Sequence, residues 1–304
     1  MKQTRNDGGN MKKILLLALT FTFSLSLFAA DIFTYVPFTG TVKSYTKTEF
    51  SIASKFGNYF RTPSVKYLHI FDDNKRELES DELTPRDSVV NKLVSTYDSN
   101  GKLTGQTFTN SDGDLVWKST YTYKDGLKAD FSEYDAKDNL KDRTIYTYEN
   151  GLLVDETSYD GEGVLVWKTI YKYNSNGKID TISEYEARGS LSDLRTYGYN
   201  ETGALDSITY FNSFSDKQTQ EVFRYGSNGV LNEITTYDDT KQIIKRLLIK
   251  YDAKGNVNRL SEYNVAEKFG TVVNELSAMC EYVYDYDGSS TTIPVIGTSP
   301  ENAR

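Results

Sequence analysis

The sequence predicts an all-β protein, an antiparallel β-meander repeat array with about 25–26 residues and two strands per unit. We expect the array to form an elongated, twisted single sheet or a partly curled half-shell. Two observations lead to this prediction. A tyrosine–turn–glycine unit recurs between residues 97 and 263, and the interval from each glycine to the next tyrosine is 22 residues. A fixed period in this range indicates a repeat architecture.

The repeated unit begins with Tyr97-Asp-Ser-Asn-Gly-Lys-Leu. All variation in its length lies in the turn, which reads Tyr-x-x-Gly in two copies and Tyr-x-x-x-Gly in the others. Paired strands require this, because a one-residue slip inside a strand would turn every side chain to the opposite face. The tyrosine and glycine recur at Tyr123/Gly126, Tyr148/Gly151, Tyr173/Gly177, Tyr199/Gly203, Tyr225/Gly229 and Tyr251/Gly255.

The turn sequences are those of tight β-hairpins. Asp125-Gly126 and Asn150-Gly151 fit two-residue loops, which need positive φ at both central residues. The Ser-Asn-Gly turns fit three-residue loops with glycine in the left-handed conformation. Counting outward from either loop pairs the tyrosine with the residue two after the glycine, for example Leu103. Such a pair contributes roughly 0.2–1 kcal/mol, so we interpret the motif as a repeated hairpin staple.

Each unit also contains a weaker second copy of the motif, such as Tyr134 followed by Asp138 and Leu140. We therefore expect 14 to 17 strands between residues 71 and 288. The same counting places five apolar side chains on the face opposite the tyrosines, which makes both faces mixed and favours a thin sheet over a sandwich. These residues are Phe131, Ile182, Ile208, Ile234 and Leu260.

Four segments are predicted along the chain. Residues 1–30 are typical of a signal peptide, because two lysines precede an apolar run of about fifteen residues that ends in alanines. Residues 31–70 form an N-terminal capping segment with one or two strands and a short helix from Ser51 to Phe60. Residues 71–288 form the repeat array, and residues 289–304 form a disordered C-terminal tail.

Composition restricts the partners and the chemistry. Four basic residues and one acidic residue lie in residues 1–30, so the net charge changes from −8 to −11 without them. This charge disfavours nucleic acid and anionic membrane surfaces as partners. The single cysteine, Cys280, excludes an intramolecular disulfide, and the single histidine, His69, argues against histidine-based triads and multi-histidine metal sites. We expect no cofactor, no metal ion and no membrane span in the mature chain.

Two near-identical units hold the candidate ligand-binding residues. Trp117 and Trp167 occupy equivalent positions within Leu-Val-Trp-Lys, beside two Tyr-x-Tyr pairs. An aromatic strip of this kind can stack on sugar rings or dock a partner strand. The alternative interpretation is the more buried face of the sheet, stabilised by aromatic pairs across strands. The tyrosines of these pairs are Tyr121 and Tyr123 in the first unit, and Tyr171 and Tyr173 in the second.

Other chemical motifs are not matched. The acidic turns lack the ligand spacing of an EF-hand loop or of the nonapeptide calcium repeat, and Asp and Gly are common in turns for structural reasons. No nucleophile elbow of the G-x-S-x-G type and no phosphate-binding loop is present. Carboxylates are frequent, but no two of them stand out as a glycosidase pair. We therefore predict no catalytic residues.

The Tyr-Asp-x-x-Gly-x-Leu pattern, as at Tyr97 to Leu103, resembles the YD repeat of the RHS superfamily over residues 71–288. The resemblance implies antiparallel strips, which in that superfamily wind into hollow shells that enclose a toxin or stand on cell surfaces. This chain has far fewer units and no recognisable core-processing and toxin region, so a closed shell is not expected. Tyr148-Glu-Asn-Gly-Leu-Leu is also similar to MORN-type variant repeats, although their Gly-x-Trp core is missing.

These observations predict a non-enzymatic, exported repeat protein that acts as a binding or structural module. Its partner would be a glycan, an envelope component or a protein. Its location would be the periplasm, the cell surface or the medium, without a lipid anchor, because no cysteine lies directly after the apolar run, where the new N-terminus would form. One alternative is a carboxylate-dependent envelope or glycan hydrolase. Another is a small YD-repeat protein associated with a toxin system, which rests on the resemblance alone.

Overall fold

A computed structural model describes residues 32–55 and 57–287. The chain divides into two compact units, residues 1–37 and residues 38–304. In the first unit, a short 3-10 helix, η1 (Ile32–Thr34), is closed by backbone hydrogen bonds from Tyr35 and Val36 to the Ile32 carbonyl. Every strand among the described residues belongs to the second unit.

The second unit contains 18 described strands, and most have 7 to 10 residues. Four are longer, namely β1, β2, β17 and β18, with 12 to 15 residues. The strands are β1 (Ser44–Lys55), β2 (Asn58–Phe71), β3 (Glu77–Leu83), β4 (Val89–Tyr97), β5 (Leu103–Asn110), β6 (Leu115–Lys124), β7 (Leu127–Asp135), β8 (Leu140–Glu149), β9 (Leu152–Asp160), β10 (Leu165–Tyr173), β11 (Ile179–Glu186), β12 (Leu191–Tyr199), β13 (Leu205–Asn212), β14 (Lys217–Tyr225), β15 (Leu231–Tyr237), β16 (Ile243–Tyr251), β17 (Val257–Lys268) and β18 (Thr271–Asp285).

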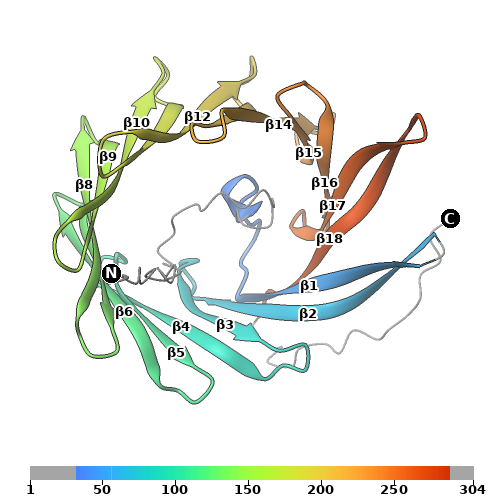
Figure 1. Cartoon of the computed structure of the whole chain (residues 1–304). Helices are drawn as coiled ribbons and strands as arrows, with labels where there is room; N and C mark the ends of the chain where they lie inside the picture. Colours follow the sequence, from blue (N-terminus) through green and yellow to red (C-terminus); the bar gives the residue numbers. More distant parts are fainter. Residues whose placement is uncertain (1–31, 56, 288–304) are drawn as a thin grey trace, which may run out of the picture. The chain divides into compact units, whose positions relative to one another are not determined.

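The sheet closes on itself. Each strand pairs antiparallel with its neighbours in the chain, and β1 also pairs with β18, from Ser44 opposite Asp285 to Phe50 opposite Met279. The result is a closed 18-stranded antiparallel barrel, which appears as a ring of strands in Figure 1. The expected antiparallel meander is confirmed. The expected open twisted sheet or half-shell is wrong, because β1 pairs with the strand edge that an open array would leave exposed.

The repeat count agrees with the sequence, since the 16 strands β3 to β18 lie within residues 71–288. The helix expected from Ser51 to Phe60 is not formed in the described residues of this range, because residues 51–55 belong to β1 and residues 58–60 to β2. The predicted signal peptide and C-terminal tail lie outside the described residues, and the division of the chain into four segments stays a prediction.

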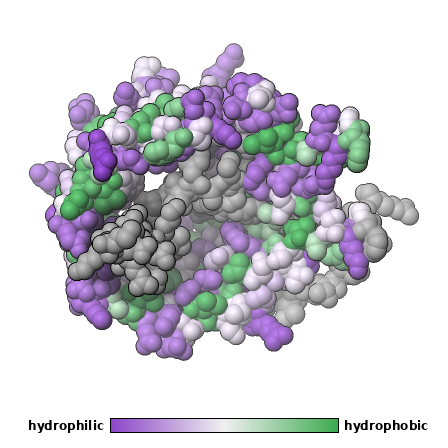
Figure 2. All heavy atoms as spheres, viewed as in Figure 1, coloured by the Kyte–Doolittle hydropathy of each residue, from purple (hydrophilic) through white to green (hydrophobic). Residues whose placement is uncertain are grey.

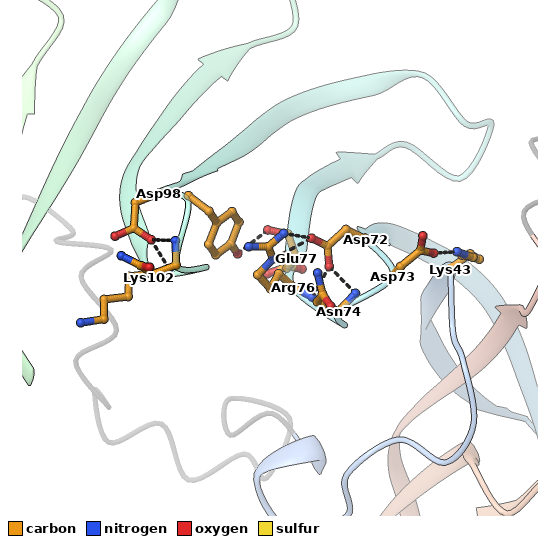
Figure 3. A network of polar contacts seen from close by, with 10 residues as sticks. Lys43, Asp72, Asp73, Asn74, Arg76, Glu77, Asp98 and Lys102 are labelled. Carbon is orange, nitrogen blue, oxygen red and sulfur yellow. Dashed lines mark hydrogen bonds and ion pairs between the residues drawn. The ribbon is translucent and has the colours of Figure 1, made fainter. Parts of the chain in front are cut away.

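An Asp or Asn that follows the motif's tyrosine, or the residue in its place such as Phe71, caps the turn. The Oδ1 atom of Asp72 accepts hydrogen bonds from the backbone N–H groups of Asn74 and Arg76, both at 2.9 Å, and Asp98 repeats the arrangement with Asn100 and Lys102 (Figure 3). These bonds explain the acidic turns without a metal ion. The same pair of bonds forms at Asn110, Asp135, Asp160, Asn174, Asn200, Asp238 and Asp252.

The motif's tyrosine joins three consecutive strands. Tyr225 in β14 lies opposite Leu231 in β15, as the sequence predicts, and its hydroxyl donates a 2.8 Å hydrogen bond to the Leu205 carbonyl in β13. The tyrosine is therefore both a cross-strand partner and a bridge to the preceding unit. Equivalent hydroxyl–carbonyl bonds are formed by Tyr97, Tyr123, Tyr173, Tyr199, Tyr251 and Tyr284.

A β-bulge beside each of these tyrosines except Tyr284 overturns one sequence expectation. In β6 and β7, Thr122 lies opposite Asp130 and Tyr123 lies opposite Lys128, so one residue of β7 is unpaired. An extra residue reverses the alternation of side chains beyond it. Phe131 therefore lies opposite Tyr121, on the same face as the tyrosines and not on the opposite face. The register places Ile182, Ile208, Ile234 and Leu260 on this face as well.

Two observations identify the face that carries these tyrosines as the inner face of the barrel. Residues 38–43, the part of the second unit that leads into β1, run on the inner side of the ring of strands (Figure 1), and Phe38 contacts the rings of Tyr45, Phe71 and Tyr284 at centroid distances of 5.5 to 6.2 Å. The tyrosine face is also the less exposed one on β6, where Ser119 is buried and Thr120 is exposed. Side chains on a concave face are more crowded, which accounts for the difference.

The outer face carries ion pairs between neighbouring strands, with exposed valines such as Val94 and Val283 among them. Arg143 pairs with Asp130, and Arg246 pairs with Glu233 at 2.8 Å, between neighbouring strands. Lys92 pairs with Glu79 in the same way at 2.6 Å. In the view of Figure 2, hydrophilic side chains are spread around the outer wall, with smaller hydrophobic patches between them.

The bridging hydroxyl can be tested at Tyr225. We expect Tyr225→Phe to lower the free energy of unfolding by about 0.5–1.5 kcal/mol, because the Leu205 carbonyl loses its donor. Urea unfolding followed by circular dichroism measures the loss. The matched control is Tyr185→Phe, since Tyr185 forms the same Tyr–Leu pair with Leu191 on the outer face. Equal losses in both variants would contradict the bridging role.

Candidate functional site

The candidate site lies on the inner face, where two repeat units have a polar side chain at a position that is apolar in the other units. The position five residues after each motif glycine is apolar in five units, those of Phe131, Ile182, Ile208, Ile234 and Leu260. The two other units carry Gln106 and Glu156 there. A polar side chain on a crowded face is costly unless it has partners, so these two residues are expected to interact specifically.

Gln106 in β5 orients a tyrosine of the neighbouring strand. Its amide oxygen accepts a 2.7 Å hydrogen bond from the Tyr121 hydroxyl in β6. Its amide nitrogen donates to the Ser95 hydroxyl in β4 at 3.3 Å. The Tyr121 ring also packs against Phe131 at a centroid distance of 5.2 Å. Burial, which is the main cause, raises the pKa of Tyr121, so its hydroxyl stays a hydrogen-bond donor at neutral pH.

Glu156 in β9 forms the second half of the arrangement. Burial raises the pKa of Glu156, and a hydrogen bond with the Tyr171 hydroxyl in β10 and the charge of Lys128 partly offset this rise. The Lys128 ammonium in β7 lies 4.0 Å from the centre of the Tyr146 ring, a cation–π contact. Burial lowers the pKa of Lys128, against the opposing effect of Glu156.

Together, Gln106, Tyr121, Lys128, Tyr146, Glu156 and Tyr171 form what we call the inner cluster, which spans the consecutive strands β5 to β10. It combines three aromatic rings with amide, ammonium and carboxylate groups on one face. Such a combination can stack on a flat or ring-shaped ligand while hydrogen-bonding to its polar edges.

Polar groups continue around the inner face beyond this cluster. Thr169 lies between Glu156 and Glu184 in register and is 3% exposed, and its hydroxyl has no hydrogen-bond partner in the described structure. Thr236, between Glu221 and Lys245, shows the same features at 4% exposure. Both hydroxyl groups can exchange hydrogen bonds with water or with a polar ligand at the inner face.

Carboxylates give the inner face a negative character. Glu133 and Asp142 lie directly opposite each other on β7 and β8, and burial raises the pKa of both. Glu184 pairs with Arg195. Glu221 in β14 accepts a 2.8 Å hydrogen bond from Tyr210, and burial raises its pKa to about 7 despite that bond and the charge of Lys245.

The six binding residues proposed from the sequence all lie on the inner face, but the structure does not bring the two tryptophans together. Trp117 lies in β6 and Trp167 in β10, and these strands are not neighbours. The Trp117 ring stacks on Phe108 at a centroid distance of 5.3 Å and an interplanar angle of 11°. Their role in ligand binding stays a prediction.

The four tyrosines divide into two pairs with different surroundings. The hydroxyls of Tyr123 and Tyr173 donate to the carbonyls of Leu103 and Leu153, at 2.9 and 2.7 Å, so they are part of the hairpin staple. Tyr121 and Tyr171 instead donate to side chains of the inner cluster. The second pair is therefore the better candidate for ligand contact.

Sequence reasoning missed Gln106, Lys128, Tyr146 and Glu156. Tyr146 occupies the same repeat position as Tyr121 and Tyr171, and this equivalence could have revealed it. Gln106 and Glu156 could have been found as polar exceptions at an apolar repeat position. Their partnership with tyrosines was hidden because the bulge changes the face on which they lie.

Two further properties apply to the described chain. Within residues 32–55 and 57–287, no group of three or more His, Cys, Asp or Glu side chains is arranged to hold a metal ion. No helix among the described residues is long and apolar enough to cross a membrane.

Comparison with known proteins gives structural similarity alone. No family model matches the sequence, and no curated protein matches it. A porin-like protein from Bacteroides uniformis is 12% identical with a TM-score of 0.46, and the match covers 80% of this chain and 98% of that one. A porin-like protein from Bacteroides vulgatus is 10% identical with a TM-score of 0.36, covering 82% and 100% of the two chains.

A Tc holotoxin pore from Photorhabdus luminescens is also similar, at 13% identity and a TM-score of 0.22, over 70% of this chain and 16% of that one. Because all three identities are low and all three TM-scores lie below 0.5, these similarities establish neither a family nor a function.

The perturbed pKa of Glu221 predicts a pH dependence. An acid whose pKa is raised from 4.5 to about 7 by folding binds its proton more tightly in the native state, so stability falls as pH rises from about 5 to 8. Glu221→Gln, which cannot ionise, should lose less thermal stability over this range, as measured by melting at each pH. Glu201→Gln in an exposed turn is the control. An unchanged pH profile in Glu221→Gln would contradict the assignment.

Proposed function

We propose that this chain is an exported, non-enzymatic binding protein whose inner face binds a neutral glycan. The observation that carries the proposal is the inner cluster, where two polar exceptions to the repeat orient Tyr121 and Tyr171 on one face. Apolar side chains at both positions would be sufficient for the repeat to fold. Gln106 and Glu156, which take their place, are therefore accounted for by ligand recognition.

The chemistry of the cluster favours sugars. Aromatic rings stack on the apolar faces of sugar rings, while amide and carboxylate oxygens accept hydrogen bonds from sugar hydroxyls. Barrels of 16 to 18 strands enclose more space than their own side chains fill, which gives a ligand room at the inner face. The excess of carboxylates, including Glu133, Asp142 and Glu184, disfavours anionic ligands.

The side chains of the outer face favour contact with water over contact with lipid. Ion pairs such as Arg143–Asp130 and Arg246–Glu233 lie in mid-strand on the outer wall. A wall in contact with lipid would need a continuous apolar band instead. Together with the signal peptide predicted for residues 1–30, this supports export to the periplasm, the cell surface or the medium. The YD-like repeats, on this proposal, build the scaffold and take no part in toxin delivery.

One observation favours the hydrolase alternative. Glu133 and Asp142 form a pair of inward carboxylates with raised pKa values, as general acid catalysis would require. Turnover of a bound glycan that disappears in Asp142→Asn, with binding retained, would establish this alternative over the binding function.

The binding proposal is tested by calorimetric titration of the purified protein with neutral and anionic oligosaccharides. We expect binding of a neutral member, and we expect Tyr121→Leu and Tyr171→Leu each to weaken it about tenfold or more, equivalent to about 1.4 kcal/mol. Leucine keeps much of the side-chain volume but removes the flat ring and the hydroxyl.

Matched controls separate binding from folding. Tyr134→Leu and Tyr185→Leu make the same change on the outer face of β7 and β11 and should leave affinity unchanged. Near-ultraviolet circular dichroism verifies that each variant is folded. Binding of anionic glycans alone, or equal losses on both faces, would contradict the proposal.

A further inference from the structure

The β17–β18 hairpin extends past the point where the barrel wall is complete. The last residue pair between β1 and β18 is Phe50 with Met279. Residues 271–278 of β18 continue beyond it, and among the described strands this part of β18 pairs only with β17. The extension results from the seven residues that the last repeat unit contains beyond the 22-residue interval. The repeat therefore does not require this hairpin tip.

The backbone groups that face the free edge of β18 can be identified in two independent ways. Phe269-Gly270 is a two-residue loop with φ values of 53° and 73°, so Lys268 and Thr271 form its hydrogen-bonded closing pair and every second pair after it is also hydrogen-bonded. The N–H groups of Val272, Asn274 and Leu276 then point away from β17. The Leu276 N–H does so, since it donates to the Tyr59 hydroxyl at 3.3 Å.

The open edge thus consists of Val272 and Asn274, because Tyr59 covers Leu276. Val272 is 67% exposed, and Asn274 is also exposed. Natural sheets protect a free edge with proline, with charged side chains or with a bulge. The segment Thr271-Val-Val-Asn274 has no proline and no charge, and its residues pair with β17 in continuous register. Such an edge is suited to pairing with another strand.

The tip also exposes an aromatic side chain that the fold does not explain. Phe269 is fully exposed and has positive φ, a conformation in which Asn, Asp or Gly is the usual residue. Bulky apolar residues at such a position cost stability and gain nothing from packing within this chain. Exposed apolar residues beside an open strand edge are typical of an interaction surface.

We propose that this edge pairs with the same edge of a second copy of the chain, in an isologous dimer with its two-fold axis at Val273. In this register Val272 lies opposite Asn274 of the second copy, and each such pair exchanges two backbone hydrogen bonds. These two pairs engage the open N–H groups of the edge, those of Val272 and Asn274, in both copies. The paired region ends before Leu276, which Tyr59 already covers. Val273 meets its own copy in a non-hydrogen-bonded pair, where side chains are closest.

The charges of the edge permit self-pairing. Glu275, the nearest charged residue, lies opposite Thr271 of the second copy in this register, so no like charges oppose each other. Glu275 is also paired with Lys268 within the hairpin. A segment with like charges at the two-fold axis would instead repel its own copy.

Cross-linking tests the register. Val273→Cys should form a disulfide between two copies on mild oxidation, because the two substituted residues face each other across the axis. The native Cys280 is buried and should not contribute. Val166→Cys is the matched control, since Val166 is an exposed valine in β10, whose two edges are both paired within the barrel. It should stay monomeric.

Light scattering over a range of protein concentrations tests the dimer itself. The unmodified protein should dimerise. Val273→Lys places two ammonium groups opposite each other at the two-fold axis, so it should raise the dimer dissociation constant about tenfold or more. Val166→Lys should not. A monomer at every concentration, a dimer that Val273→Lys leaves unchanged, or a dimer in which Val273→Cys fails to cross-link would each overturn the proposal.

Discussion

The antiparallel pairing of β1 with β18 is the interaction on which the rest of the structure depends. Without it the meander would end in two open edges, and the tyrosine face would be one side of a sheet. With it, the same face becomes the concave interior of a barrel. Crowding there accounts for the raised pKa values of Glu156, Tyr121 and Glu221, whose first cause is burial.

The repeat motif and the candidate function are separate uses of the same residue types. Asp98 and its equivalents cap turns, and Tyr225 and its equivalents bridge three strands, so these positions are explained by folding. Tyr121 and Tyr171 lie on the same face, but their hydroxyls engage side chains that break the repeat. Function is therefore sought where a repeat position departs from the pattern, as at Gln106 and Glu156.

The sequence predicts the local structure well, because turn chemistry and strand length are encoded within each unit. The Tyr97–Leu103 pair and the left-handed glycine at Gly101 follow from counting alone. Closure could not be predicted, since the pairing of Ser44 with Asp285 joins residues at opposite ends of the array. The inner cluster was missed because a repeat count does not reveal the bulges beside Tyr97 and Tyr148, which change the faces on which Gln106 and Glu156 lie.

The most direct test of the account is a disulfide across the closing seam. Thr46 and Val283 lie opposite each other on β1 and β18, so the double variant Thr46→Cys/Val283→Cys should form an intramolecular disulfide that mass spectrometry detects in the monomer. The pair Thr46→Cys/Glu281→Cys, two residues out of register, should cross-link far less. An intramolecular bond in the first variant is the result that a closed barrel predicts. A monomer that does not cross-link, with both cysteines accessible to alkylation, would contradict closure.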